Sequence, residues 1–250
     1  MDIVVCIKRV PTTDTAIKVA ADGKSIDTSG VQYELNAYDE FALEQALQTK
    51  EQLGAGSVTV VTLGPKDAQK ELRDGLARGA DKAVLLTTDQ WVQDSWAAAQ
   101  VLANWIKSTE CSLVFCGKQA VDSDNSQLAP RLAAMLGFGC ITEVAKIALA
   151  DGVFNAERDI EGAREAVECK TPAVISCNKG LNEPRYANLK GIMSAKKKPL
   201  EEVAAELPEP ALSIDSLELP PARAEGRILG DGADAVPALL EALSNEVKIL

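Results

Sequence analysis

Hydrophobic runs of strand length alternate with amphipathic stretches along the first two-thirds of the chain. The runs are rich in Val, Ile and Leu, as in strands buried on both faces: DIVVCIKRV, SVTVVTLGP, KAVLLTT and SLVFCG. Between them, apolar residues recur at helical spacing, which predicts helices at about 36–54, 65–79, 94–107 and 127–136. This alternation predicts right-handed crossovers, and therefore a mostly parallel, doubly wound sheet with helices on both faces, a Rossmann-like α/β fold.

The pattern changes after Cys140. The segments CITEVAKIALADGVFNAERDI and AREAVECKTPAVISC predict strands joined by turns, with ADG as a hairpin, and we expect antiparallel additions to the sheet. From about Ala205 the chain is rich in proline and acidic residues, which predicts an extended arm with a short helix at about 235–246. We therefore expect an α/β domain at 1–204 and a C-terminal arm at 205–250. The arm's Leu and Ile side chains cannot be buried within an extended segment, so the arm either wraps a partner or is a frayed terminus.

Composition narrows the classes of function. Of 250 residues, 46% are hydrophobic and 25% are charged, which is typical of globular proteins. No run approaches the roughly 20 apolar residues of a membrane span. The N-terminal MDIVVCIKRVP leads directly into a strand without the pattern of a leader, so we expect a cytoplasmic protein, or a mitochondrial matrix protein in a eukaryote.

The reactive residue types are few. The chain has no histidine, which excludes Ser-His-Asp and Cys-His catalytic arrangements. Its six cysteines are scattered through apolar runs and form no CxxC pair, so zinc and iron–sulfur sites lack their usual ligand spacing. We expect buried thiols that act as small hydrophobic residues, no metal site, and no catalytic acid, base or nucleophile.

Polar residues gather where the predicted strands end, which is where open α/β sheets bind their ligands. The segments concerned are CIKRVP, LNAYD, TLGP and CGKQAVDSDNSQ. The last combines Gly117, two carboxylates (Asp122 and Asp124) and two amides (Asn125 and Gln127) just before a predicted helix. A helix N-terminus suits a phosphate, and the amides and carboxylates suit a ribose or a base. Neither GxGxxG in the first turn nor GxxxxGK[ST] is present, and simple capping of the helix by this loop is the alternative.

Positive charge is concentrated between Arg185 and Lys198, where five basic residues and no acidic residue occur in a chain of net charge −11. A nucleic-acid patch is disfavoured, because the segment has one tyrosine and the chain as a whole would repel phosphates. Lysines at the end of a helix explain part of the cluster. A protein-docking loop explains the remainder, with Leu189, Ile192 and Met193 as an apolar anchor framed by charges.

The segments VCIKRVP, LNAYDEFALEQAL, LGP, GKQAVDSD and NEPRYANLKGIMSAKKKP resemble the beta-subunit family of electron transfer flavoproteins, from the first strand to about Pro199. The resemblance implies an electron carrier, not an enzyme, that forms a heterodimer with an alpha subunit. Such a carrier accepts electrons from acyl-CoA and related dehydrogenases on FAD, held mostly by the alpha subunit, and passes them to a quinone-linked oxidoreductase. In this family the beta subunit holds AMP as a structural ligand.

The resemblance also assigns two sets of residues. Those implied to contact the nucleotide are Cys6, Asn36, Ala37, Tyr38, Asp39, Leu63, Gly117, Lys118, Gln119, Ala120, Val121, Asp122, Asp124, Asn125 and Gln127. Those implied to dock the dehydrogenase, in a recognition loop at about 178–199, are Arg185, Tyr186, Leu189, Ile192, Met193, Lys196 and Lys197. The leucine at position 189 is the one implied to enter a hydrophobic pocket of the dehydrogenase. We expect no nucleic-acid partner and no direct insertion into a membrane.

One departure from the family pattern leaves the nucleotide open. AMP-binding relatives read D-D-D-x-N-Q-T-G, whereas this chain reads DSDNSQLAP from Asp122 to Pro130. Ser123 and Pro130 are more similar to electron-bifurcating relatives, whose beta subunit holds a second FAD that accepts hydride from NADH. The longer NEPRYANL motif favours the non-bifurcating type and AMP. A stand-alone adenine-nucleotide-binding module, such as a stress-type α/β protein, is a third hypothesis.

Overall fold

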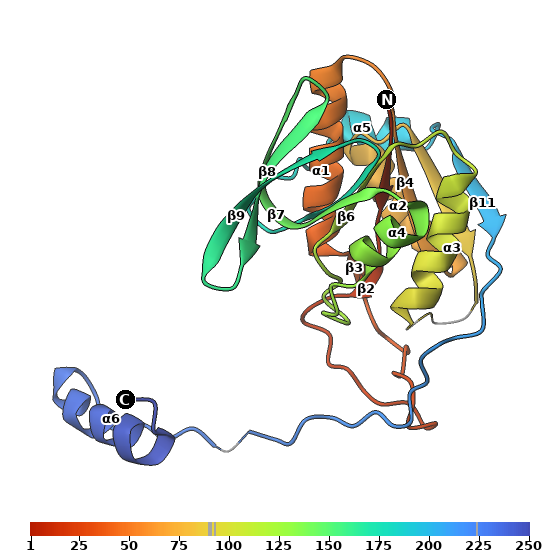
Figure 1. Cartoon of the computed structure of the whole chain (residues 1–250). Coiled ribbons are helices and arrows are strands. Elements are labelled where there is room, and N and C mark those ends of the chain that lie inside the picture. The colour runs from red at the N-terminus through yellow and green to blue at the C-terminus, as the bar shows by residue number, and fades with distance from the viewer. Residues whose placement is uncertain (90–91, 93, 224) are drawn as a thin grey trace.

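A computed structural model describes the chain from residue 1 to residue 250 except positions 90, 91, 93 and 224. Its centre is a nine-stranded sheet in the order β11-β5-β4-β1-β6-β10-β7-β8-β9 (Figure 1). All neighbouring strands from β11 to β7 run parallel, and β7, β8 and β9 form an antiparallel edge. The strands are β1 (Asp2–Cys6), β4 (Ser57–Gly64), β5 (Lys82–Thr87), β6 (Leu113–Gly117), β7 (Gly139–Ala150), β8 (Val153–Ile160), β9 (Ala163–Lys170), β10 (Ala173–Cys177) and β11 (Leu200–Ala204).

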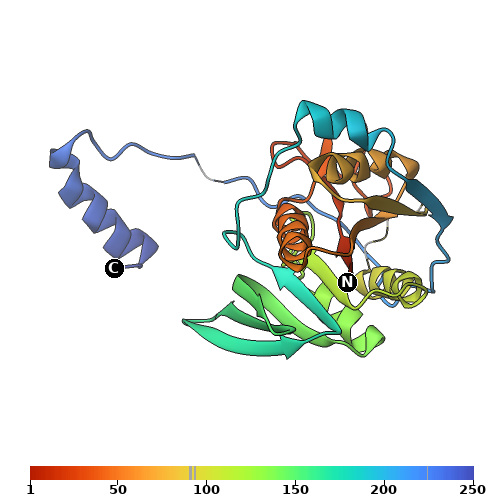
Figure 2. The same ribbon diagram turned by 90° about the horizontal axis from the view of Figure 1, so that it is seen from above.

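Helices cover the sheet on both sides, which gives three layers (Figure 2). One side carries α1 (Ala37–Leu53), α2 (Gln69–Arg78, preceded by the 3-10 turn η1 at Lys66–Ala68) and α5 (Leu189–Ala195). The other side carries α3 (Ser95–Lys107) and α4 (Leu128–Leu136). Two hydrophobic clusters follow from this division, because alternate residues of β1 face opposite layers: Ile3 and Val5 pack under α1 and α2, whereas Val4 and Cys6 pack under α3 and α4.

The order of the strands creates a switch point next to β1. The chain passes from β1 outward to β4 and β5, and then returns to the other side of β1 as β6. The connection after β1 therefore crosses one face of the sheet, and the connection after β6 crosses the other. The two connections diverge at the carboxyl ends of β1 and β6 and leave a crevice between them. Open α/β sheets bind their ligands at such a point.

The predicted fold class and the four N-terminal helices are confirmed, but three details differ. The first hydrophobic run divides after Cys6, and Arg9–Pro11 forms β2, which pairs with β3 (Tyr33–Leu35) in a separate two-stranded sheet. The expected antiparallel additions are confirmed for β7 to β9, but β10 differs, because it lies parallel between β6 and β7 and is fully buried. The edge strand β11 was not predicted. The ADG hairpin is confirmed, since Asp151 and Gly152 join β7 to β8 with φ of 51° and 77°.

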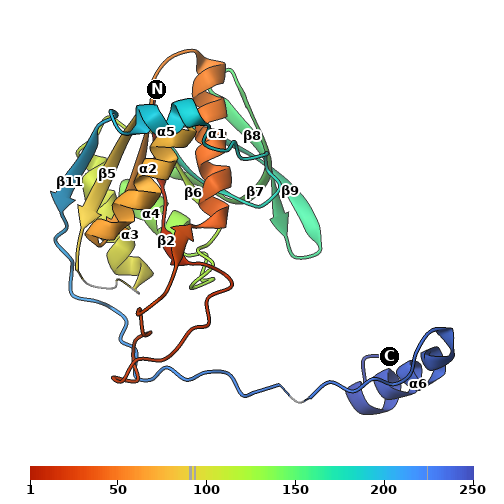
Figure 3. The same ribbon diagram turned by 180° about the vertical axis from the view of Figure 1, so that it is seen from behind.

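The C-terminal arm begins against the body and then leaves it (Figures 1 and 3). The amide of Ala211 donates to the Asp94 carboxylate at 2.8 Å, and that of Leu217 donates to the Gly23 carbonyl at 2.7 Å. Beyond these contacts the arm extends to η2 (Ala233–Ala235), α6 (Val236–Ala242) and the short π-helix η3 (Leu243–Val247), close to the helix predicted there. Within the described residues, no helix has both the length and the apolar character that crossing a bilayer requires.

Candidate nucleotide cleft and docking surface

A cleft opens at the switch point, between the carboxyl ends of β1 and β6. Its enclosed part measures about 110 Å³, and the cleft is partly open to solvent. The lining comes from the end of β1, the end of β6 with the loop after it, the first half of α3 and the beginning of α4. Its residues are Cys6, Ile7, Lys8, Asp39, Leu63, Val92, Ser95, Ala98, Leu102, Cys116, Gly117, Lys118, Gln119, Ala120, Ser123, Asn125, Ser126, Gln127 and Leu128.

Asp39, in the first turn of α1, holds the two strand ends together. Its carboxylate accepts the backbone N–H of Lys8 at 2.8 Å and that of Gly117 at 3.0 Å, on different oxygens. The side chain is buried, and burial raises the pKa of Asp39 to about 7 although both hydrogen bonds act to lower it. Asp39 is thus a brace between β1 and β6 as well as a residue of the cleft wall.

Asn36, just before α1, holds the next part of the same loop. Its amide nitrogen donates to the Gln119 carbonyl at 2.9 Å, and its oxygen accepts the Val121 N–H at 3.1 Å. The residue is 1% exposed, so both polar atoms of its side chain are used within the protein. Gly117 is required beside this brace, because a Cβ there would lie 2.4 Å from the Asp39 carboxylate oxygen Oδ1 and 2.6 Å from the Tyr38 Cβ.

Both carboxylates of the loop after β6 have a hydrogen-bonding or ion-pair partner within the protein. Asp122 pairs with the ammonium of Lys8 at 2.7 Å, and Asp124 accepts the Gln119 amide at 2.6 Å. Asp124 and Ser126 have φ of 46° and 52°, which lets the chain turn tightly before α4. The alternative, that Asp124, Asn125 or Ser126 is the N-cap of α4, is contradicted, because Gln127 is the N-cap residue and its side chain makes no cap hydrogen bond. Asn125 accepts only the N–H of Gln127 itself, at 3.3 Å.

This arrangement offers an anionic ligand two kinds of donor. In the first turn of α4, the N–H groups of Leu128 and Ala129 lack intrahelical partners and lie at a helix N-terminus, where a phosphate is favoured, whereas Pro130 has no N–H. Lys8 and Gln119 have further N–H donors beyond those that bind Asp122 and Asp124, whereas the Ser126 hydroxyl already donates its one hydrogen to the Gln119 side-chain oxygen at 3.0 Å. The residues present therefore fit an adenine nucleotide, whose phosphate needs such donors and whose base needs amide partners and apolar walls.

The structure separates the residues assigned to the nucleotide into two groups. Nine line the cleft: Cys6, Asp39, Leu63, Gly117, Lys118, Gln119, Ala120, Asn125 and Gln127. The other six lie outside that lining: Asn36, Ala37, Tyr38, Val121, Asp122 and Asp124. Of these, Asn36 fixes the loop after β6 and Asp122 fixes the Lys8 side chain. Both therefore affect the shape of the cleft without lining it.

Sequence reasoning missed the contribution of α3. Ser95, Ala98 and Leu102 follow helical spacing and face the cleft from this helix. The Ser95 hydroxyl donates to the Gln127 side-chain oxygen at 2.8 Å, which ties α3 to the beginning of α4. The small residues at 95 and 98 were the available signal, since a helix that borders a ligand site needs space on that side.

The segment from Arg185 to Lys198 presents apolar side chains to solvent. Tyr186 is 86% exposed, Leu189 82% and Met193 71%, and Ile192 is also exposed. The helix that carries three of them, α5, lies so close to α2 that a Cβ on Gly191 would be 2.2 Å from the Ala77 carbonyl oxygen. A rigidly seated helix with exposed apolar residues is typical of a protein-docking surface.

The positive charges of this segment divide into two groups. Lys190, Lys196 and Lys197 are exposed. Lys198 turns inward and donates to the carbonyls of Leu76 and Ala80, at the end of α2, at 2.9 and 2.6 Å. Arg185 also turns inward, toward α1. The structure thus leaves three of the five charges to frame the apolar residues.

Cysteine and acidic side chains are the remaining candidates for metal ligands and nucleophiles among the described residues. The described part of the chain contains no group of three or more Cys, Asp or Glu side chains placed to hold a metal ion. Cys6, Cys116 and Cys177 are buried, and burial raises the pKa of each thiol, which makes them poor nucleophiles at neutral pH.

Comparison with known proteins gives one consistent result. Residues 24–208 match the electron transfer flavoprotein domain family. The chain is 39% identical to the electron transfer flavoprotein subunit beta of Bacillus subtilis (strain 168), with all of both chains covered. It is 34% identical to the protein of that name from Bradyrhizobium diazoefficiens and 33% identical to the mitochondrial one from Arabidopsis thaliana, again over the full length of both chains.

Proposed function

This chain belongs to the electron transfer flavoprotein family, and we propose that it serves as the beta subunit of a heterodimeric electron carrier. The flavin of such a carrier supplies the redox chemistry, and the protein supplies position and environment. The observation that carries the proposal is the joint presence of a nucleotide-type cleft at the switch point and an exposed apolar docking surface on α5. A stand-alone nucleotide-binding module would not require an exposed apolar surface for a partner protein.

We infer that the cleft holds AMP and that FAD is bound mostly by the alpha subunit. The remaining donors of Lys8 and Gln119, together with the first turn of α4, support a nucleotide phosphate. The alternative is a second FAD in this cleft, as in a bifurcating carrier that oxidises NADH.

The stoichiometry of the purified heterodimer tests this assignment. We expect one FAD from its absorbance and one AMP in the supernatant after denaturation, identified by chromatography and mass. Two FAD and no AMP would contradict the assignment and favour the bifurcating type. Isolation of this chain with AMP but without any flavin-containing subunit would instead favour a stand-alone adenine-nucleotide-binding module.

We further infer that the docking surface receives an acyl-CoA dehydrogenase or a related dehydrogenase, and that a quinone-linked oxidoreductase accepts the electrons. Leu189 is the proposed anchor, because it is the most exposed aliphatic side chain on α5. Truncation of such an anchor typically weakens binding about 10-fold or more.

Leu189→Ala is therefore expected to slow flavin reduction by the dehydrogenase, measured by stopped-flow at subsaturating concentrations, with unchanged flavin content. Ile160→Ala, which removes an exposed aliphatic side chain at the end of β8, is the matched control. Equal rates for Leu189→Ala and the unmodified heterodimer would overturn the docking assignment.

We place this carrier in the cytoplasm of a bacterium, or in the mitochondrial matrix of a eukaryote. The names of its relatives support both settings, since they come from bacteria and from mitochondria. The extended arm, with the exposed Leu239 and Leu240 on α6, is proposed to wrap the alpha subunit, which would bury side chains that the arm itself leaves uncovered.

A further inference from the structure

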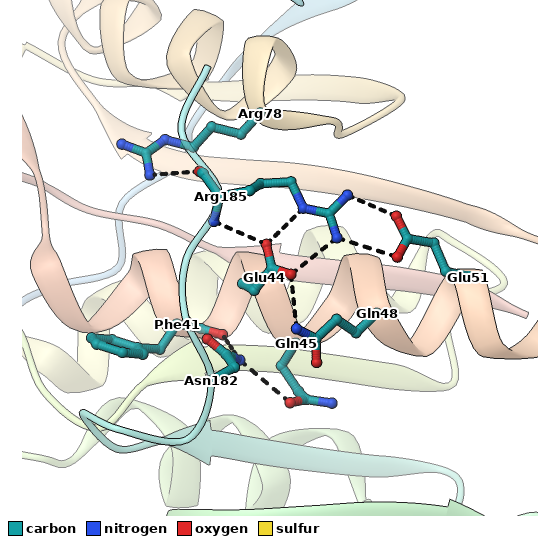
Figure 4. Close-up of polar contacts among 8 residues, drawn as sticks. All are labelled: Phe41, Glu44, Gln45, Gln48, Glu51, Arg78, Asn182 and Arg185. Carbon is teal, nitrogen blue, oxygen red and sulfur yellow. Dashed lines mark hydrogen bonds and ion pairs between the residues drawn. The ribbon is translucent and has the colours of Figure 1, made fainter. Parts of the chain in front are cut away.

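The chain segment that leads into the docking surface is fixed to α1 by a polar network (Figure 4). Arg185 is at its centre, and its side chain extends along α1 between two glutamates of that helix, Glu44 and Glu51. Both glutamates come from the same side of α1, two turns apart in sequence. The positive charge of Arg185 is therefore paired within the chain and needs no partner protein.

The contact with Glu44 is the more buried half of the network. The Arg185 Nε lies 2.7 Å from Glu44 Oε2, and its Nη2 donates to Glu44 Oε1 at 3.0 Å. The backbone N–H of Arg185 donates to the same carboxylate at 3.2 Å, so main chain and side chain are held together. The Glu44 side chain is only 5% exposed, so the carboxylate of this bidentate pair is shielded from water, whereas the Arg185 side chain is 37% exposed.

The contact with Glu51 completes the network at the surface. Nη1 and Nη2 of Arg185 reach the two Glu51 oxygens at 2.7 and 3.2 Å. The hydrogen bonds that Arg185 donates lower the pKa of the Glu51 carboxyl, and the same bonds to Glu44 and Glu51 raise the pKa of Arg185. Four of the five Arg185 contacts use the guanidinium fork, which a lysine ammonium cannot reproduce.

Two further contacts fix the main chain on either side. Arg78 of α2 donates to the Arg185 carbonyl at 3.3 Å, and Asn182 donates to the Phe41 carbonyl of α1 at 3.0 Å. The next residue after Arg185 is the exposed Tyr186, and Leu189 follows three positions later at the start of α5. The position of Arg185 thus determines where the exposed apolar residues begin.

We propose that Glu44, Arg185 and Glu51 form a positioning clamp that presents Tyr186 and Leu189 to the partner protein in a preorganised arrangement. This inference rests on the proposed docking function. The clamp increases affinity by reducing the conformational freedom that would otherwise be lost on binding. Arg185 acts through geometry, and the charges that steer the partner are Lys190, Lys196 and Lys197.

The Arg185→Lys variant separates geometry from charge, because it keeps the positive charge and loses the fork. We expect the KM of the dehydrogenase for the heterodimer to rise about 3- to 10-fold in Arg185→Lys, with an unchanged limiting rate of flavin reduction. Arg185→Gln is expected to match Arg185→Lys. The control is Arg164→Lys, which makes the same change in an exposed ion pair with Asp159 at the far edge of the sheet.

A double-mutant cycle with Leu189→Ala tests whether the clamp acts through the anchor. If the clamp positions Leu189, the KM of the combined variant Arg185→Lys/Leu189→Ala will rise by less than the product of the two single-variant increases. The reason is that a displaced Leu189 contributes less to binding, so its removal costs less. Amide hydrogen exchange of the heterodimer provides a second readout. Residues 183–192 are expected to exchange faster in Arg185→Lys and at the normal rate in Arg164→Lys.

The outcomes distinguish this inference from the docking function on which it rests. If Leu189→Ala leaves KM unchanged, the docking assignment fails. If Leu189→Ala raises KM but Arg185→Lys behaves as the unmodified protein while Arg185→Gln does not, Arg185 acts as a steering charge and the clamp is rejected. Strictly multiplicative losses in the cycle, with normal hydrogen exchange, would also reject it.

Discussion

Helix α1 supports two regions of this molecule by different means. Its beginning holds the proposed nucleotide cleft through Asn36 and Asp39, which make four hydrogen bonds to the backbone just after β1, at the end of β6 and in the loop after β6. Its middle and end hold the docking segment through Glu44 and Glu51, which pair with one arginine. The first set is buried, whereas the second extends from a buried carboxylate to an exposed one.

The difference teaches how each region tolerates change. A buried backbone N–H that loses its acceptor costs about 1–3 kcal/mol, whereas an exposed ion pair contributes about 0–1 kcal/mol. The cleft is therefore expected to depend on every member of its brace, and loss of a member will affect the whole sheet. When the Arg185 contacts are weakened, the segment that leads into α5 is expected to move with little loss of global stability. Such changes are therefore expected to appear in partner binding more than in unfolding.

Gly117→Ala is expected to have the largest effect. The added Cβ would lie 2.4 Å from Asp39 Oδ1 and 2.8 Å from the Tyr38 backbone carbon, so the brace and the end of β6 must move apart. We expect a loss of about 3 kcal/mol of unfolding free energy, measured by urea denaturation, together with loss of the nucleotide. Gly226→Ala is the control, because nothing lies within 4 Å of its Cβ position. A variant of normal stability that retains the nucleotide would show that the cleft is not braced as described.

Asp39→Asn follows, with an expected loss of about 2 kcal/mol. The asparagine amide would turn an N–H donor toward the backbone N–H of either Lys8 or Gly117, and one of these would lose its acceptor. Thermal and urea unfolding measure the loss. Asp151→Asn is the control, since this exposed turn residue has φ of 51°, which asparagine adopts readily. Equal losses in the two variants would contradict a special role for Asp39.

Asp39 should also make stability depend on pH in an unusual direction. Burial raises its pKa to about 7 in the folded protein from the ordinary value of 3.8. Between about pH 4 and 7 the folded state keeps a proton that the unfolded chain has released, so the stability contributed by this group falls as pH rises and levels off above 7. One such proton changes the unfolding free energy by up to about 1.4 kcal/mol per pH unit.

The measurement is the difference between the unmodified protein and Asp39→Asn, followed from pH 4.5 to pH 8. Subtraction removes the contributions of carboxyls with lowered pKa, such as Asp2 and Glu51, which act in the opposite direction. A difference that is independent of pH would contradict a raised pKa for Asp39.

The smallest effects are expected at the docking segment, where the two glutamates of the clamp can be compared directly. Glu44→Gln places an amide donor against the Arg185 donors at a buried site, and we expect a loss of about 1–2 kcal/mol. Glu51→Gln weakens an exposed pair, and we expect about 0.5 kcal/mol or less. Both are measured by urea unfolding, and a larger loss for Glu51→Gln would reverse the assignment of buried and exposed halves.

The sequence allowed prediction of those features that depend on local pattern. The apolar spacing of Leu43 and Leu47 indicated α1, the branched aliphatic run after Met1 indicated β1, and the exposed character of Leu189 beside lysines indicated docking. The inward direction of Arg185 and Lys198 was not predictable, because their partners lie more than 100 positions away and a run of basic residues carries no information about them. The same holds for Ser95, whose place at the cleft depends on how α3 packs.

By itself, the sequence determined the alternation of strands and helices, the strand ends at which ligands bind, and the family, because each of these is written in contiguous segments. The tertiary structure alone decided which of those polar groups are free. Asn36 and Asp122 carry the chemistry of ligand contacts, yet hydrogen bonds and an ion pair to distant residues commit them to the protein itself. The physical reason is that a buried polar group takes whatever partner the fold brings within about 3 Å, and only packing brings the partner there.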